Sequence, residues 1–150
     1  MEKSFVTVSD KVAGVHLCKE KGTDCATVLP ETEQRSVSIH TTGDVVMQIV
    51  CCFEEKLMQM ITQNMYGGEL PAQQVPLYIK EYVNIVCGHG VSELNNRYHT
   101  RIRLSVPICL WQGQDENLCE EQEHPWMQLA FDTNYGMMSV QIFHETQDNL

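Results

Sequence analysis

The stretch YIKEYVNIVCGHG, residues 78–90, carries the pattern on which the predicted fold rests. At about 100° per residue around a helix axis, the apolar residues in and around it gather in one sector. That sector holds Val75, Ile79, Val83, Val86 and Gly90, with Tyr82 and Leu94 on its flanks. The pattern predicts a helix from about Pro76, where a missing N–H costs little, to about Asn96, with this side packed on a core.

The opposite side of the same helix has a different character. Glu81, Asn84 and Gly88 fall within about 60° of one another there, and Leu77 and Ile85 share that side. A carboxylate, an amide and apolar side chains together on an exposed surface are typical of a contact patch. These five residues are therefore the candidate site, and we refer to them as the outer strip.

Gly88 allows two interpretations. A glycine in a helix interior costs about 1 kcal/mol relative to alanine, so a glycine on an outward side can mark a place where another chain approaches closely. Alternatively, Gly88 and Gly90 only kink or weaken the helix around His89.

The chemistry available to the outer strip is limited but definite. The Asn84 amide has one acceptor and two donors, so it can orient a water molecule, but it cannot act as a base near neutral pH. The Glu81 carboxylate can pair with a lysine of a partner. Together they can position a water for attack on a good leaving group if the partner's own site stabilises the charge. They cannot by themselves cleave an unactivated bond.

A hairpin and a helix are predicted before this segment. The β-branched runs SVSIH and VVMQIVCC flank TTGD, whose Gly43 can supply the positive φ of a hairpin loop. The second run is apolar on both faces, which predicts a central strand. EEKLMQMITQNMYGG follows, with Leu57, Ile61 and Met65 at i, i+4 and i+8. Because Gly67 comes just past its end, this pattern indicates an amphipathic helix.

The final third of the chain returns to strand patterns. RIRLSVPICLW and WMQLAFD are strand candidates, and TNYG turns into MMSVQIF, whose apolar and polar residues alternate. The order of elements predicts an α+β fold with two long helices packed on a mainly antiparallel β-sheet. We expect one domain over residues 1–150. In residues 1–35 a short strand, SFVTV, and a helix capped by Ser9 both remain open.

Charge and hydropathy exclude several partners. The formal charge is −10, from 20 acidic and 10 basic residues, so nucleic acid and anionic membrane surfaces are not expected as partners. No apolar run approaches the roughly 18 residues that span a bilayer, and the start MEKSFVTVSD lacks the apolar stretch of a signal peptide. We expect a cytoplasmic protein without membrane insertion. The acidic residues between Gln114 and His124 are typical of a solvated loop.

The seven cysteines form no CxxC pair, and an odd number without a secretory signal suits a reducing compartment. We interpret them as small buried hydrophobic residues. A metal site built from Cys18, Cys25 and histidines would match no familiar zinc spacing. No metal or cofactor is therefore expected in this chain.

At this point the sequence resembles the CheC, CheX and FliY family of chemotaxis phosphatases, and its CheX branch in particular. The family's helix motif is approximately E-x-x-N-x-x-x-G, and EYVNIVCG places Glu81, Asn84 and Gly88 at those spacings. The preceding hairpin, the helix that ends in MYGGEL and the later LSVPICLWQG also resemble the family's pattern. A single E-x-x-N pair is present, as in CheX. The resemblance covers about residues 36–143.

The resemblance implies a phosphatase that acts on the aspartyl phosphate of a CheY-like response regulator. The helix would insert into the regulator's active site, where Asn84 would orient the attacking water and Glu81 would engage the regulator's lysine. Mg²⁺ would be held by the regulator. CheX-like members commonly form homodimers, and the two-sided apolar strand VVMQIVCC is compatible with a sheet shared across a dimer. The alternative function is a non-catalytic adaptor or dimerisation domain.

Overall fold

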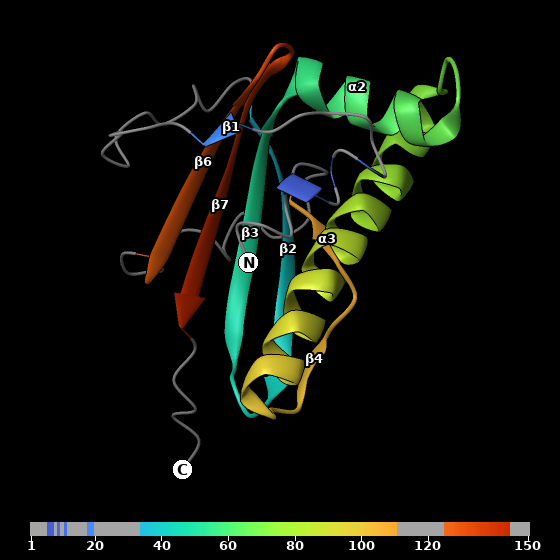
Figure 1. Cartoon of the computed structure of the whole chain (residues 1–150). Coiled ribbons are helices and arrows are strands. Elements are labelled where there is room, and N and C mark those ends of the chain that lie inside the picture. The colour runs from blue at the N-terminus through green and yellow to red at the C-terminus, as the bar shows by residue number, and fades with distance from the viewer. Residues whose placement is uncertain are drawn as a thin grey trace.

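A computed structural model provides the structure, which describes residues 6, 7, 9, 11, 18–19, 34–110 and 125–144. Within these residues, seven strands form one antiparallel sheet. The strands are β1 Cys18–Lys19, β2 Gln34–Gly43, β3 Met47–Glu54, β4 Ile102–Leu104, β5 Ile108–Cys109, β6 Met127–Thr133 and β7 Gly136–His144. Their order is β1-β6-β7-β3-β2-β4 (Figure 1). Strand β5 pairs with β2 as well.

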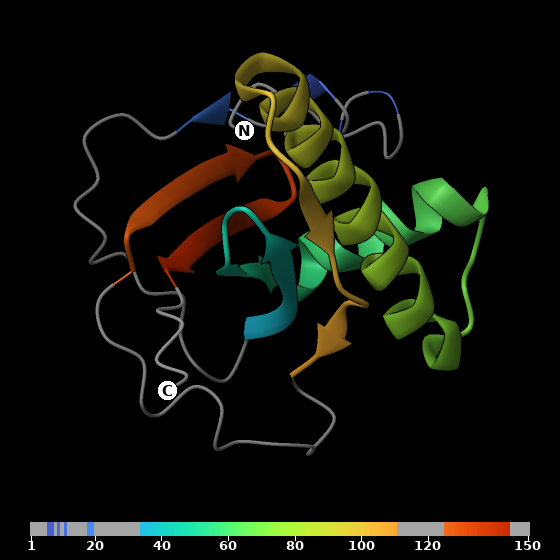
Figure 2. The same ribbon diagram turned by 90° about the horizontal axis from the view of Figure 1, so that it is seen from below.

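The helices pack on one face of this sheet. Helix α2 covers Glu55–Tyr66, the 3-10 turn η2 covers Ala72–Gln74 and helix α3 covers Val75–Tyr98. In Figure 2 α3 lies beside the curved sheet, with α2 at its N-terminal end. One apolar core joins both helices to the alternate, inward residues of β2, β3, β6 and β7. None of the helices among the described residues is long and apolar enough to cross a membrane.

The predicted pair of long helices is confirmed only for α3. Helix α3 has 24 residues, whereas α2 has 12, and we correct that part of the prediction. Gly67 ends α2 in the left-handed conformation, with φ 91°, and its N–H donates to the Gln63 carbonyl. Glycine adopts this conformation without steric cost, so the helix stops where the sequence pattern placed its end.

The predicted hairpin and central strand are confirmed. Strands β2 and β3 pair directly, and Gly43 near their connection has φ 99°. A side chain at Gly43 would collide with the Arg101 carbonyl, so both conformation and space call for glycine there. Strand β3 lies between β2 and β7, and its residues 47–53 are all buried. Both faces of β3 are therefore buried, which explains why both carry apolar side chains.

The strand predicted over RIRLSVPICLW is interrupted, which is a second correction. Residues 102–104 form β4 and residues 108–109 form β5, with Ser105, Val106 and Pro107 between them. Pro107 has no N–H to donate to a ladder, so it is tolerated only at such a break. The strands predicted at WMQLAFD and MMSVQIF are confirmed as β6 and β7.

Most of residues 1–35 and the acidic stretch between Gln114 and His124 lie outside the described residues. In the N-terminal part, Val6 and Thr7 are helical, so the strand predicted at SFVTV is wrong at these two positions. Cys18–Lys19 adds a short strand, β1, to β6 at one edge of the sheet.

Candidate functional site

The side of α3 that faces away from the core presents Glu81 and Asn84. Both side chains are exposed. Within the described part of the chain, neither the Glu81 carboxylate nor the Asn84 amide has a hydrogen-bond or ion-pair partner. Their hydrogen-bonding groups therefore remain available to water or to another molecule.

The other three residues of the outer strip lie around this pair. Leu77 is 63% exposed, one turn before Glu81. Ile85 is half-buried and packs against the edge of the core, so it presents only part of its surface. Gly88 is also half-buried, and a Cβ built there would meet only Leu104 Cδ1, at the ordinary contact distance of 3.8 Å. Internal packing thus leaves room for a Cβ at position 88.

Tyr82 fixes the rotation of α3 from the inner side. Its side chain is fully buried, and its ring lies edge-on to Phe53, with centroids 6.0 Å apart. Its hydroxyl hydrogen-bonds with the Ser9 hydroxyl, which is also fully buried, and lies 3.9 Å from Met138 Sδ. Burial raises the pKa of the Tyr82 hydroxyl, and the Ser9 hydrogen bond opposes that effect. Tyr82 is thus held in the core, whereas the neighbouring Glu81 is exposed.

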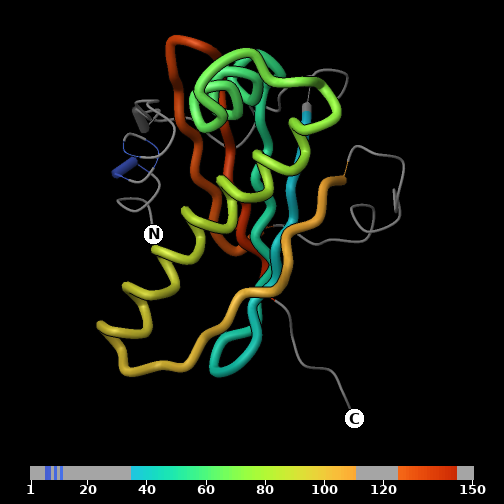
Figure 3. The backbone as a smooth tube through the Cα atoms, turned by 90° about the vertical axis from the view of Figure 1, so that its right-hand side faces the viewer, coloured from blue at the N-terminus to red at the C-terminus, as the bar shows by residue number. Residues whose placement is uncertain are grey.

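Asn95, near the C-terminus of α3, holds the start of the segment that runs back along the helix. Asn95 donates through its amide nitrogen to the Ile102 carbonyl at 3.0 Å and accepts from the Ile102 N–H at 2.9 Å. Asn95 Oδ1 also accepts from the Thr100 hydroxyl at 2.9 Å. These bonds start strand β4 beside the C-terminal turn of α3, so residues 102–109 run back antiparallel to the helix (Figure 3).

Burial is described for four of the seven cysteines, and all four are buried, as predicted. Cys51, Cys52, Cys87 and Cys109 are buried free thiols. A hydrogen bond with Cys87 raises the pKa of Cys51, and burial raises it further, so this thiol stays protonated near neutral pH. Among the described residues, no group of three or more His, Cys, Asp or Glu side chains could hold a metal ion.

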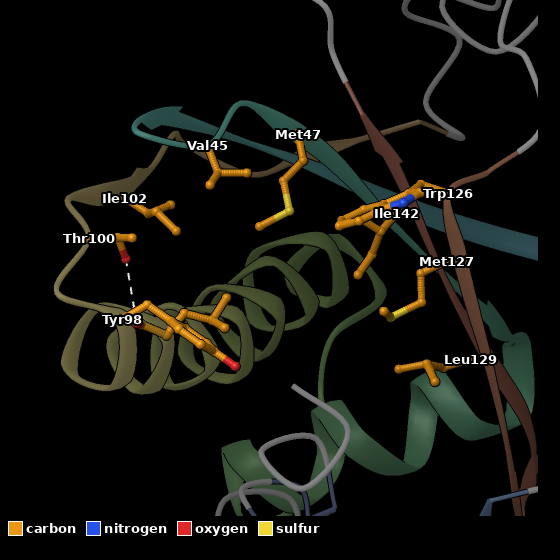
Figure 4. Close-up of a pocket in the computed structure, with 10 residues that line it drawn as sticks. Val45, Met47, Tyr98, Thr100, Ile102, Trp126, Met127, Leu129 and Ile142 are labelled. Atoms are coloured by element: carbon orange, nitrogen blue, oxygen red, sulfur yellow. Dashed lines mark hydrogen bonds between the residues drawn. The ribbon is translucent and has the colours of Figure 1, made fainter.

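A cavity of about 490 Å³ lies at the other end of α3, near its C-terminus. It opens between the helix, the β2–β3 hairpin and strands β6 and β7 (Figure 4). Its lining residues are Val45, Met47, Leu94, Tyr98, Thr100, Ile102, Trp126, Met127, Leu129 and Ile142. Tyr98 and Trp126, which are 62% and 67% exposed, lie on opposite sides of it.

This cavity includes none of the residues of the outer strip. Asn84 and Leu94 are ten positions apart, or about 15 Å along the helix. Sequence reasoning missed the cavity because its residues come from five separate segments, each of which looks like ordinary core. Only the sheet register brings them together.

The solved structures that this chain resembles share one fold. CheX from Vibrio vulnificus aligns with a TM-score of 0.74 and 20% identity, over 96% of this chain and 93% of that chain. CheX from Desulfovibrio desulfuricans gives 0.72 and 14%, over 96% and 95%. A CheX–CheY–BeF₃–Mg²⁺ complex from Borrelia burgdorferi gives 0.71 and 15%, over 97% and 95%. The molecule therefore has the α+β fold of CheX-like proteins.

The sequence comparison defines the family. The model for "Chemotaxis phosphatase CheX" matches residues 35–131, which include α3 and the whole outer strip. No curated protein matches the sequence. The chain belongs to the CheX family of chemotaxis phosphatases.

Proposed function

We propose that the protein hydrolyses the aspartyl phosphate of a CheY-like response regulator. The observation that carries this proposal is the exposed, unpartnered pair of Glu81 and Asn84 on α3, in a chain that matches the CheX phosphatase family. The regulator would receive the outer strip in its own active site. The CheX–CheY complex of Borrelia burgdorferi supports a regulator of this type as partner.

In the proposed reaction, one water molecule and the aspartyl phosphate give aspartate and inorganic phosphate. The water oxygen forms a bond to phosphorus while the bond from phosphorus to the aspartate oxygen breaks. The electron pair leaves with the carboxylate, and both protons of the water end on the phosphate product, which leaves as H₂PO₄⁻. Asn84 orients the water in line with the breaking bond. Because an acyl phosphate is already labile, positioning the nucleophile is a sufficient contribution.

Glu81 serves to align the two proteins. Its carboxylate would pair with the lysine of the regulator's phosphorylation site. The regulator would also supply Mg²⁺, which neutralises charge on the phosphoryl oxygens. This chain then needs no metal or cofactor of its own.

The test follows the decay of a phosphorylated regulator from the same organism, with and without this protein. The native protein should accelerate the decay, and Asn84→Ala should reduce the acceleration by about a hundredfold because the water is no longer oriented. Asn96→Ala is the matched control, since Asn96 is an exposed asparagine of the same helix, twelve positions from Asn84. It should keep full activity.

Two results contradict the proposal. If the native protein gives no acceleration but binds the regulator, the adaptor function replaces the phosphatase. If acceleration survives Asn84→Ala, the reacting group lies elsewhere.

Homodimer formation and a cytoplasmic location stay predictions. Size-exclusion chromatography with light scattering tests whether the protein forms a homodimer.

A further inference from the structure

We infer that the bulge at Val106 and Pro107 forms the second wall of the surface that docks the response regulator, with Val106 as its main apolar contact. This inference rests on the proposed function, because it extends the docking surface from the outer strip on α3 to the neighbouring segment of residues 102–109. The occupant is the receiver domain of the regulator, around its phosphorylated aspartate.

The register of the sheet locates the bulge. Leu104 pairs with Thr41, whereas Ile108 pairs with Ser38. Ser105 is opposite His40, since its N–H donates to the His40 carbonyl at 2.8 Å and its Oγ accepts from the His40 N–H at 3.0 Å. Val106 and Pro107 are thus left opposite the single residue Ile39. Two residues opposite one define a β-bulge, a device that redirects side chains and occurs at sheet edges and beside active sites.

The bulge turns Val106 into solvent. Its side chain is 78% exposed, the largest fraction among the exposed large hydrophobic residues of the described chain. Nearby Ile108 is 47% exposed. Exposed apolar side chains that gather beside polar groups mark interaction sites, whereas scattered ones need no explanation.

Contacts of α3 place this bulge next to Asn84. Pro76, Lys80, Asn84 and Gly88 follow one another at intervals of four and form one ridge along the helix. Near one end of the ridge, the Cys109 thiol lies 3.8 Å from the Pro76 carbonyl oxygen. At the other end, Leu104 approaches Gly88. Between these two contacts the chain runs antiparallel to α3 (Figure 3), so we place its middle residues alongside Asn84, which lies between Pro76 and Gly88 on the ridge.

The charge of Lys80 agrees with this placement. Burial raises the pKa of the Cys109 thiol to about 11, and the nearby charge of Lys80 acts in the opposite direction. Lys80 is thus close to β5, one turn before Asn84. A partner that brings its phosphorylated residue to Asn84 would contact Val106 on one side of the helix and Leu77 near its start.

The test measures initial rates of dephosphorylation against the concentration of phosphorylated regulator, for the native protein, Val106→Asp, Val106→Ser and Tyr98→Asp. An apolar contact replaced by a charge should raise KM by roughly tenfold or more and change kcat by less than about twofold. Val106→Ser should raise KM by less. Tyr98→Asp is the matched control, because Tyr98 is 62% exposed on the same helix but lies at the cavity end. Its KM should not change.

A binding measurement separates this inference from the proposed function. The regulator is activated with beryllofluoride and Mg²⁺, and its Kd is measured by calorimetry for the same variants. Loss of binding in Val106→Asp supports the docking surface even if the native protein hydrolyses nothing. Unchanged KM and Kd in Val106→Asp, with an active and Asn84-dependent native protein, overturn the docking surface and leave the phosphatase intact. A change of oligomeric state in place of a change in KM would also overturn it, since the bulge would then be a contact between copies of the chain.

Discussion

The inward and outward sides of α3 differ in what holds their side chains in place. On the inward side, Ile79, Tyr82 and Val83 are fully buried against the sheet. On the outward side, Glu81 and Asn84 are exposed and have no partner among the described residues. The fold therefore depends on the first set and is indifferent to the second. Glu81 and Asn84 are not needed for folding, and they lie within the residues that the family model matches. Their side chains can therefore contact a partner.

The largest effect on the free energy of unfolding is expected for Ile79→Ala. Ile79 is fully buried in the core, and truncation of such a side chain leaves a cavity that costs about 2–5 kcal/mol. Leu77→Ala is the control from the opposite side, because Leu77 is 63% exposed and should change stability by less than about 0.5 kcal/mol. Urea denaturation measures both. Equal losses would show that the two sides of α3 are not distinct.

A smaller loss is expected for Tyr82→Phe. This change removes the hydroxyl that hydrogen-bonds with Ser9 and leaves the fully buried Ser9 hydroxyl without that partner, at a cost of about 1–3 kcal/mol. Tyr98→Phe, at an exposed tyrosine of the same helix, should be neutral.

The pH dependence of the Tyr82→Phe effect gives a second readout. The buried Tyr82 hydroxyl has a pKa above its ordinary value of 10.0. It therefore stays protonated at pH values at which the same tyrosine in the unfolded chain is already ionised. Stability from this group is present below pH 10 and falls as the pH rises further. The difference between the native protein and Tyr82→Phe should therefore shrink above about pH 10. A constant difference would contradict the burial of the hydroxyl.

Gly88→Ala should act in opposite directions on folding and on binding. The free energy of unfolding should rise by up to about 1 kcal/mol, because alanine favours a helix and a Cβ at position 88 meets only Leu104 at 3.8 Å. If the regulator approaches the helix at this glycine, KM for the phosphorylated regulator should rise. Gly43→Ala provides the contrast, since its positive φ and the nearby Arg101 carbonyl predict a loss of stability. A stabilised variant with unchanged KM would assign Gly88 no role in docking.

The two sides of α3 could be predicted from the sequence because burial on a helix follows its period. On that basis the sequence predicts Ile79, Val83 and Val86 in the core, and all three are fully buried. The same helical period predicts Glu81 and Asn84 on the side of α3 that faces away from the core, and both are exposed. The helical period also predicts Tyr82 on the flank of the core, but its partner Ser9 lies 73 positions away and no local pattern indicates that contact.

The bulge at Val106 and Pro107 could not be predicted in the same way. Pro107 indicates an irregular strand, but the extra residue exists only relative to β2, whose paired residues lie between 59 and 72 positions earlier. The cavity near Tyr98 has the same origin, since it depends on how β3, β6 and β7 align. Local periodicity thus predicts which side of an element is buried, whereas register decides what lies next to the site.

The smallest effect on stability is expected for Asn84→Ala, and it is the sharpest test of the comparison. Asn84 is exposed and unpartnered among the described residues, so its replacement should change the free energy of unfolding by no more than about 0.5 kcal/mol. The same change should remove most of the phosphatase activity. Urea denaturation and regulator dephosphorylation are measured on one preparation, with Asn96→Ala beside it. A large loss of stability would make Asn84 a structural residue, and any loss of activity would then follow from the fold and not from an unpositioned water.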